Sequence, residues 1–119
     1  LLDPRRALLA AEPPQRMVAP ANTTIGVIAT DAVLTKAQAS RLASAGHDGL
    51  ARSIQPAHTM LDGDTLFALG TGAGGRPAEM VLLATLAAEA VALATVRAVR
   101  AARGVRVGGL HIPGASELA

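Results

Sequence analysis

The 119-residue sequence contains no cysteine, no tryptophan and no tyrosine, and its only aromatic residue is Phe67. Without cysteine there is no disulfide, no thiolate nucleophile and no cysteine-based zinc site, which excludes disulfide-rich secreted scaffolds and zinc fingers. Catalytic groups must therefore carry oxygen or nitrogen. Because apolar residues make up 50% of the chain and are almost all aliphatic, we expect a single core of Ala, Val, Leu and Ile.

Charge is also scarce, since 11 Lys and Arg against 9 Asp and Glu give a formal net charge of +2. The sequence pI of about 10.4 is typical of nucleic-acid binding. However, the arginines are spread along the chain and aromatic residues for base stacking are almost absent, so we expect no nucleic-acid partner. A basic segment followed by an apolar signal region is not visible, and we expect a cytoplasmic protein.

Prolines mark the first segment of the chain. Residues 1–21 hold four of the seven prolines, which predicts a linker that could contain one helical turn. Residues 24–32 then form a nearly continuous apolar run rich in β-branched side chains, the pattern of a strand covered on both faces. A second strand is predicted over 65–69, and a short one over 105–107.

Two helices are predicted between and after these strands. Thr35 and Gln38 have the spacing of a capping box at the start of a helix that runs to about Ser53. Its apolar positions fall three and four apart, namely Ala39, Leu42, Ala43, Gly46, Leu50 and Ile54. Pro77 predicts the first turn of a longer, alanine-rich helix that runs to about Arg103 and stops at Gly104.

The second helix raises the question of a membrane span. Residues 80–96 are apolar enough to suggest one, but Glu89 interrupts them and a span needs about 20 apolar residues. We therefore expect a core helix and no membrane.

Two glycine-containing segments resemble known binding motifs. Residues 70–75 satisfy the G-x-G-x-x-G pattern of a dinucleotide-binding turn, but the acidic residue required about 20 positions further on would fall inside the helix, near Glu89. Asp62-Gly63-Asp64 has too few oxygen ligands for magnesium or calcium, and Asp-Gly is a common hairpin turn. We expect a turn here and neither a cofactor nor a metal.

Asn22-Thr23-Thr24 lies where the proline-rich segment meets the first strand. It could be a glycosylation acceptor or an ordinary strand entry. A hydroxyl here could also attack the preceding carbonyl, and hydrolysis of the resulting ester would leave a chain beginning with Thr. An α-amino group ordinarily has a pKa of about 7.7 to 8.0 and can act as the base for its own hydroxyl.

A Ser/His/Asp triad is a poorer explanation, because the sequence lacks a G-x-S-x-G elbow. We assign His47, beside the apolar stripe of its helix, to packing as a hydrogen-bonded residue and not to catalysis. His58, in the polar turn, and Thr24, beside the candidate nucleophile, are candidates for shaping a site.

Together, the segments 22–25, 47–52, 58–59 and 62–68 resemble the L-aminopeptidase/D-esterase family, which includes β-peptidyl aminopeptidases and nylon-oligomer hydrolases. The resemblance covers roughly residues 22–103. It implies an αββα sandwich and a precursor that cuts itself between Asn22 and Thr23. By the same resemblance Thr23 matches the nucleophile, while Asp62 and Asp64 match the polar pair beside it.

The resemblance also divides the chain. Residues 1–22 match the end of an α portion, and residues 23–119 match a β portion that begins at the nucleophile. The chain would then supply only part of the fold, and its partners would be the α portion, a small peptide or amide substrate, and further αβ units in a homo-oligomer.

The leading hypothesis is a self-processing aminopeptidase or amidohydrolase that needs no cofactor. One alternative is acyl transfer of the ornithine acetyltransferase type, which also follows a cut before Thr. Another is an assembly module without enzymatic activity.

Overall fold

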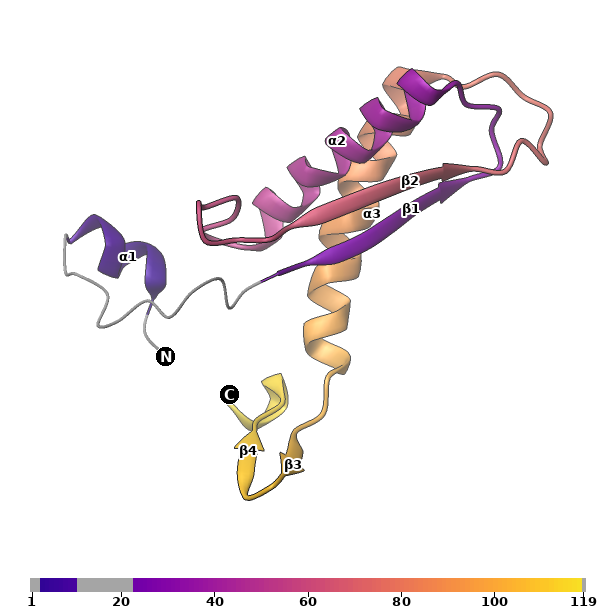
Figure 1. Ribbon diagram of the computed structural model, residues 1–119. Coiled ribbons are helices and arrows are strands. Elements are labelled where there is room, and N and C mark those ends of the chain that lie inside the picture. Colours follow the sequence, from indigo (N-terminus) through magenta and orange to yellow (C-terminus); the bar gives the residue numbers. More distant parts are fainter. Residues whose placement is uncertain (1–2, 11–22, 119) are drawn as a thin grey trace.

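The computed structural model describes residues 3–10 and 23–118 and forms a mixed α/β fold (Figure 1). Along the chain its elements are α1 (Pro4–Leu9), β1 (Ile25–Thr30), α2 (Lys36–Ser53), β2 (Thr65–Gly70), α3 (Met80–Ala101), β3 (Val105–Val107), β4 (Leu110–Ile112) and the 3-10 helix η1 (Ala115–Glu117). The predicted helical turn near the start corresponds to α1. The boundary between residues 22 and 23 falls at the edge of the described part, so the two-part division stays a prediction.

Strands β1 and β2 run parallel, with Ile25 opposite Thr65 at one end and Thr30 opposite Gly70 at the other. Helix α2 makes the crossover between them, as a parallel pair requires. Helices α2 and α3 pack against each other on one side of the two strands (Figure 1). Since the strands are parallel, the Asp-Gly segment before β2 is not the hairpin turn that its composition favoured.

The start of α2 follows from two residues. The Thr35 backbone N–H donates to Gln38 Oε1 at 2.9 Å, and the Gln38 N–H donates to Thr35 Oγ1 at 3.3 Å. These bonds satisfy amide groups that would otherwise lack partners in the first turn, and the predicted capping box is confirmed. The helix ends before Ile54, whose extended backbone leads into the loop that precedes β2.

The core is small and depends on close approach of backbones. Leu42 and Leu50 of α2 are fully buried, as the helical spacing predicted. Ala45 and Gly49 are also buried, although the predicted apolar stripe left them out. A side chain at Gly49 would collide with the Ala88 carbonyl of α3, so the absence of a Cβ lets the two helices touch.

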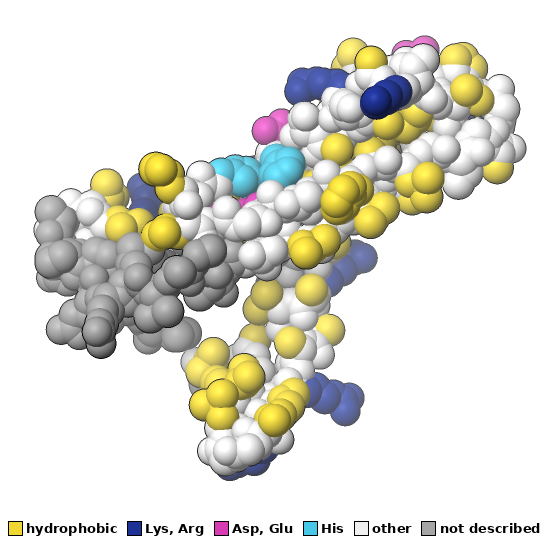
Figure 2. Space-filling view, viewed as in Figure 1, with side chains coloured by type: hydrophobic (Ala, Val, Ile, Leu, Met, Phe, Trp, Pro, Cys, Tyr) yellow, Lys and Arg dark blue, Asp and Glu magenta, His cyan; other side chains and the backbone are white. Residues whose placement is uncertain are grey.

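Only one face of the two-stranded sheet is covered by the described residues. Leu66 points toward α2 and is 8% exposed, whereas Ile25, Val27 and Phe67 are 71%, 66% and 55% exposed on the other face. Figure 2 shows hydrophobic side chains along the strands on this open side. The expected burial of the strand on both faces is therefore not met within the described part of the chain.

Helix α3 differs from its prediction at the start. Pro77 forms an isolated parallel bridge with Val33, and the Val33 N–H donates to the Arg76 carbonyl at 2.9 Å. The segment after β2 thus still follows the chain leaving β1, and the helix begins three residues later at Met80. It ends at Ala101, slightly before the predicted end.

Most of α3 is uncovered by the described residues. By length and composition it could cross a membrane, and 11% of its most apolar window is buried. Ala87 and Ala88 form the buried stripe against α2, while Arg52 of α2 and Glu89 of α3 pair at 2.9 Å on the exposed side. The predictions of a core helix and of no membrane stay predictions.

The chain ends in a small antiparallel hairpin, β3–β4, beyond α3. Its turn is Gly108-Gly109, and both residues have the positive φ that tight hairpin turns require. His111 pairs with Glu117 of η1 at 3.0 Å. Strand β3 confirms the short predicted strand, whereas β4 and η1 were not predicted.

Candidate active site

The candidate residues meet where the two parallel strands begin. Thr23 and Thr24 lead into β1, and Asp62 to Asp64 lead into β2. Because parallel strands in register start at the same edge, the pairing of Ile25 with Thr65 brings these two segments together. The sheet register thus joins groups that lie about 40 residues apart in the sequence.

Asp64 and Gly63 contact the start of β1 directly. The Thr24 N–H donates to Asp64 Oδ1 at 2.9 Å, and the Thr65 N–H donates to the Thr24 carbonyl at 2.8 Å. A Cβ placed on Gly63 would lie 2.7 Å from Thr23 Oγ1. The threonine hydroxyl therefore rests against a glycine backbone, next to a carboxylate that fixes the following amide.

Asp62 has a different partner. Its Oδ2 accepts the Thr59 N–H at 2.7 Å, and its own N–H donates to the Thr59 carbonyl at 3.1 Å. These two bonds close residues 59–62 into a turn within the loop 58–64. The two carboxylates thus serve separate purposes, because Asp62 shapes the loop while Asp64 holds the strand that carries Thr23.

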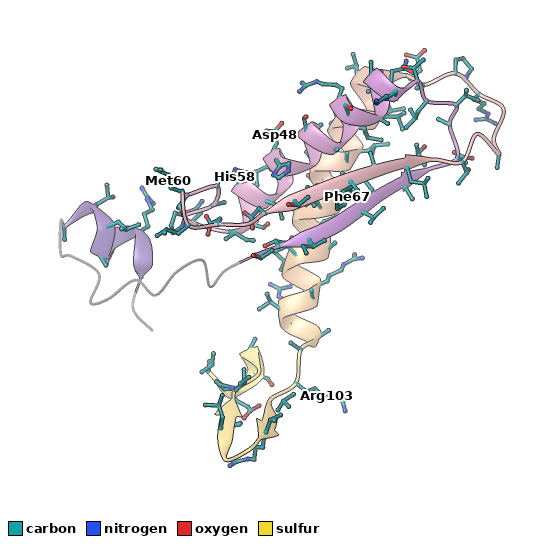
Figure 3. The ribbon with its side chains drawn as sticks, viewed as in Figure 1. Asp48, His58, Met60, Phe67 and Arg103 are labelled. Carbon is teal, nitrogen blue, oxygen red and sulfur yellow. The ribbon has the colours of Figure 1, made fainter. Side chains whose placement is uncertain are left out.

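The loop is also joined to α2. His58 has a φ of +58°, and its Nε2 lies 3.0 Å from Nδ1 of His47. The two imidazoles form an exposed cluster beside α2 (Figure 2), and Figure 3 shows His58 between the loop and the helix. Sequence reasoning assigned His47 to hydrogen-bonded packing but did not identify His58 as its partner, since nothing local to either residue indicates that the chain returns to the helix here.

An open, apolar groove of about 630 Å³ is lined by Thr24, by residues of β1, α2 and α3, and by Leu66 of β2. Its lining includes the apolar residues Leu50, Val91 and Val99. Among the lining residues, Arg100 carries a charge. The groove offers a surface for apolar groups next to the candidate site.

Among residues 3–10 and 23–118, no cluster of three or more His, Asp or Glu side chains could hold a metal ion. The glycine-rich loop after β2 has positive φ at Gly72 and Gly75, but Glu89 pairs with Arg52 from the middle of α3. A dinucleotide site needs its acidic residue at the end of a neighbouring strand, so the glycine motif lacks its required partner. Asn22 lies outside the described residues.

The model of peptidase family S58 matches residues 4–111 of this chain. The chain belongs to peptidase family S58. This membership confirms the resemblance to the L-aminopeptidase/D-esterase family that the motifs indicated.

Three relatives show what this S58 chain resembles. The uncharacterized aminopeptidase Rv1333 of Mycobacterium tuberculosis is 54% identical over 95 residues, which cover 77% of this chain and 28% of that protein. The uncharacterized aminopeptidase ML1167 of Mycobacterium leprae is 69% identical over 52 residues, or 44% of this chain and 14% of that protein. The 6-aminohexanoate-oligomer endohydrolase of Paenarthrobacter ureafaciens is 44% identical over 50 residues, or 42% and 14%.

The S58 chain thus spans 28% of the length of the mycobacterial relative Rv1333 that it matches. The family match to residues 4–111 includes the strands and the loop that form the candidate site. The described part contains a βαβα unit, β1–α2–β2–α3, with one open sheet face.

Proposed function

We propose that this chain belongs to a self-processing aminopeptidase or amidohydrolase and carries its nucleophile, Thr23. The observation that supports this most is the position of Thr23 Oγ1, which lies 2.7 Å from where a Cβ on Gly63 would stand, beside Asp64 at the shared edge of two parallel strands. Family S58 is a peptidase family, and the relatives bear the names of uncharacterized aminopeptidases and of a 6-aminohexanoate-oligomer endohydrolase. The substrates would be small peptides, amides or esters.

Self-cleavage would begin with attack of Thr23 Oγ on the carbonyl carbon of Asn22. The C–N bond breaks, the acyl group moves to oxygen as an ester, and the nitrogen becomes a free amine that has gained the hydroxyl proton. Water then hydrolyses the ester and leaves the Asn22 carboxylate and a free Thr23. Asp64 supports this step because its bond to the Thr24 N–H fixes the backbone directly after the nucleophile.

In turnover the same oxygen would attack the substrate carbonyl. The α-amine of Thr23 accepts the hydroxyl proton and passes it to the departing amine, and an acyl-enzyme remains. Water, deprotonated by the same amine, releases the acid. Asp62 would keep the loop closed through Thr59 during both steps, and Asp64 would orient the nucleophile.

The partner we propose is the α portion of the same precursor. The open sheet face presents Ile25, Val27, Phe67 and Leu69, each more than half exposed. Such a contiguous apolar face marks an interaction surface. Since the chain spans 28% of the relative Rv1333, the remaining sequence is long enough to supply a second sheet. The αββα sandwich would form when that sheet packs on this face, and the αβ units would then assemble further.

The test is the mass and N-terminal sequence of the full-length protein after storage at neutral pH. We expect a fragment that begins at Thr23, and Thr23→Ala should abolish both this fragment and hydrolysis of aminoacyl amides. Thr23→Ser keeps a hydroxyl and should retain both in part. Thr85→Ala is the matched control, because its hydroxyl bonds the Val81 carbonyl at 2.8 Å on an exposed turn of α3.

A Thr23→Ala protein that is still cut after Asn22 would contradict the mechanism. Acyl transfer to ornithine without peptide hydrolysis would favour the acetyltransferase alternative. An assembled protein with an intact chain and no hydrolysis would favour the assembly module.

A further inference from the structure

We propose that His47 and His58 form a positioning pair, which holds the loop 58–64 against α2 and thereby keeps Thr23 in place for self-cleavage and hydrolysis. The inference rests on the proposed role of Thr23 and adds two residues to it. Within residues 3–10 and 23–118, neither imidazole is hydrogen-bonded to Thr23, so the pair acts through the loop.

His47 of α2 and His58 of the loop are joined by a hydrogen bond. His47 Nδ1 and His58 Nε2 lie 3.0 Å apart, and the ring planes are tilted by 55° with centroids 5.0 Å apart, which is a hydrogen bond and not a stack. One facing nitrogen must carry a proton and the other must be free of one. The pair therefore needs complementary tautomers, and replacing either ring removes the bond.

The backbone of His58 has an uncommon conformation. Its φ of +58° lies in the left-handed region, which residues other than glycine adopt infrequently. An unfavourable backbone conformation persists where the surroundings hold it in place, and such residues cluster at functional sites. The bond to His47 is one interaction that favours this conformation.

The part of α2 that carries His47 is closely packed. His47 lies between Gly46 and Gly49, which are both buried. A Cβ at Gly49 would collide with the α3 backbone at Ala88, and a Cβ at Gly46 would force the ends of the Ile28 and Leu66 side chains to shift. The segment of α2 that carries His47 is thus packed on both sides and forms a fixed support.

The seven residues of the loop 58–64 connect His58 to the groups that surround Thr23. The neighbouring Thr59 is bonded in both directions to Asp62, Gly63 rests against Thr23 Oγ1, and Asp64 holds the Thr24 amide. Figure 3 shows Met60 at the outer end of this loop, fully exposed, so the loop tip is not anchored by that side chain. A shift of His58 would be passed along this short path to Thr23.

The experiment uses the full-length protein and the variants His47→Ala, His58→Ala and the double variant. The readouts are the rate of self-cleavage before Thr23, counted per folded precursor molecule, and kcat and KM on an aminoacyl amide, with kcat counted per folded and cleaved molecule. His111→Ala is the matched control, because it removes an imidazole with a partner at 3.0 Å in the C-terminal hairpin. Thr23→Ala is measured in parallel.

We expect each single variant to lose about 10-fold or more in self-cleavage and in kcat, since small displacements of reacting groups are costly. KM should change by less than about 3-fold, because the ground-state contacts remain. The double variant should be no slower than the slower single variant, as expected for two partners of one bond. His47→Asn and His58→Gln, which place an amide near the lost ring nitrogen, should restore part of the rate.

The inference is overturned if His58→Ala keeps both rates within about 2-fold of the unmodified protein, or if the two single effects multiply in the double variant. A lower melting temperature with unchanged kcat per folded molecule would also overturn it, since that is a purely structural role. If Thr23→Ala is inactive and the histidine variants are fully active, the positioning role of His47 and His58 is rejected while the proposed function stands. Hydrolysis that persists in Thr23→Ala rejects the proposed function and the inference with it.

Discussion

Replacing Gly63 with alanine tests the geometry of the site most directly. The new Cβ would lie 2.7 Å from Thr23 Oγ1 and 3.6 Å from Thr23 Cβ and Cγ2, so the hydroxyl alone is overlapped. Nonbonded heavy atoms rest at about 3.5 Å or more, so Oγ1 must move by roughly 0.8 Å or leave its rotamer. A misplacement of about 1 Å can lower a rate by about 100-fold. We expect Gly63→Ala to slow self-cleavage and amide hydrolysis by roughly 30- to 100-fold.

The same substitution should leave the fold intact. Positive φ among the described glycines occurs at Gly72, Gly75, Gly108 and Gly109, and Gly63 is outside that group. Where alanine fits the backbone, it restricts the unfolded chain and adds about 0.4 to 1 kcal/mol of stability. The assay is a time course of intact mass on the full-length protein, with thermal unfolding of the same samples.

Gly75→Ala is the control for this experiment. Gly75 has a φ of +61° and nothing within 4 Å of an added Cβ, and it follows the far end of β2. It should lower stability by about 1 kcal/mol without slowing either reaction. Rates of Gly63→Ala within about 2-fold of the unmodified protein would refute the proposed placement of Thr23.

Two further changes probe the remaining contacts. Asp64→Ala removes the acceptor of the part-buried Thr24 N–H, a loss of about 1 to 3 kcal/mol, and should slow self-cleavage or turnover by about 5- to 100-fold, while Asp64→Asn keeps an acceptor and should be milder. Unchanged rates in both would remove Asp64 from the site. Phe67→Asp puts a charge on the open sheet face and should reduce the yield of assembled αβ protein in size-exclusion chromatography, whereas Ala51→Asp on the exposed side of α2 should not. Equal yields would argue against a covered sheet face.

Short-range sequence patterns predict most of the helices and strands of the described residues. The Thr35 and Gln38 bonds lie within one helical turn, so their spacing alone predicts where α2 begins. An apolar run rich in β-branched residues likewise located β1, and a short apolar run located β2. Pro77 lies before α3 and not in its first turn, because its bridge to Val33 depends on where another segment of the chain lies. The burial of Gly49 is not predicted by the apolar stripe, because a glycine gives no hydrophobic signal even when a helix packs on it.

The candidate site was accessible from the sequence only through its motifs. Their resemblance to a family pointed to Thr23, Asp62 and Asp64, but not to which of them touch. The parallel register of β1 and β2 decides that Asp64 meets Thr24, and a register is not readable from either strand alone. The bond between His47 and His58 depends on the return of the loop to α2 in the same way.

The edge at which β1 and β2 begin has a consequence for a protein that cuts itself. A cut between Asn22 and Thr23 would leave the nucleophile, the loop 58–64 and both strands on one continuous piece of chain. The new terminus would stay tethered from its second residue onward, because Thr24 is held through its N–H by Asp64 and through its carbonyl by Thr65. Cleavage would release the preceding segment to move while the reacting groups keep their mutual positions.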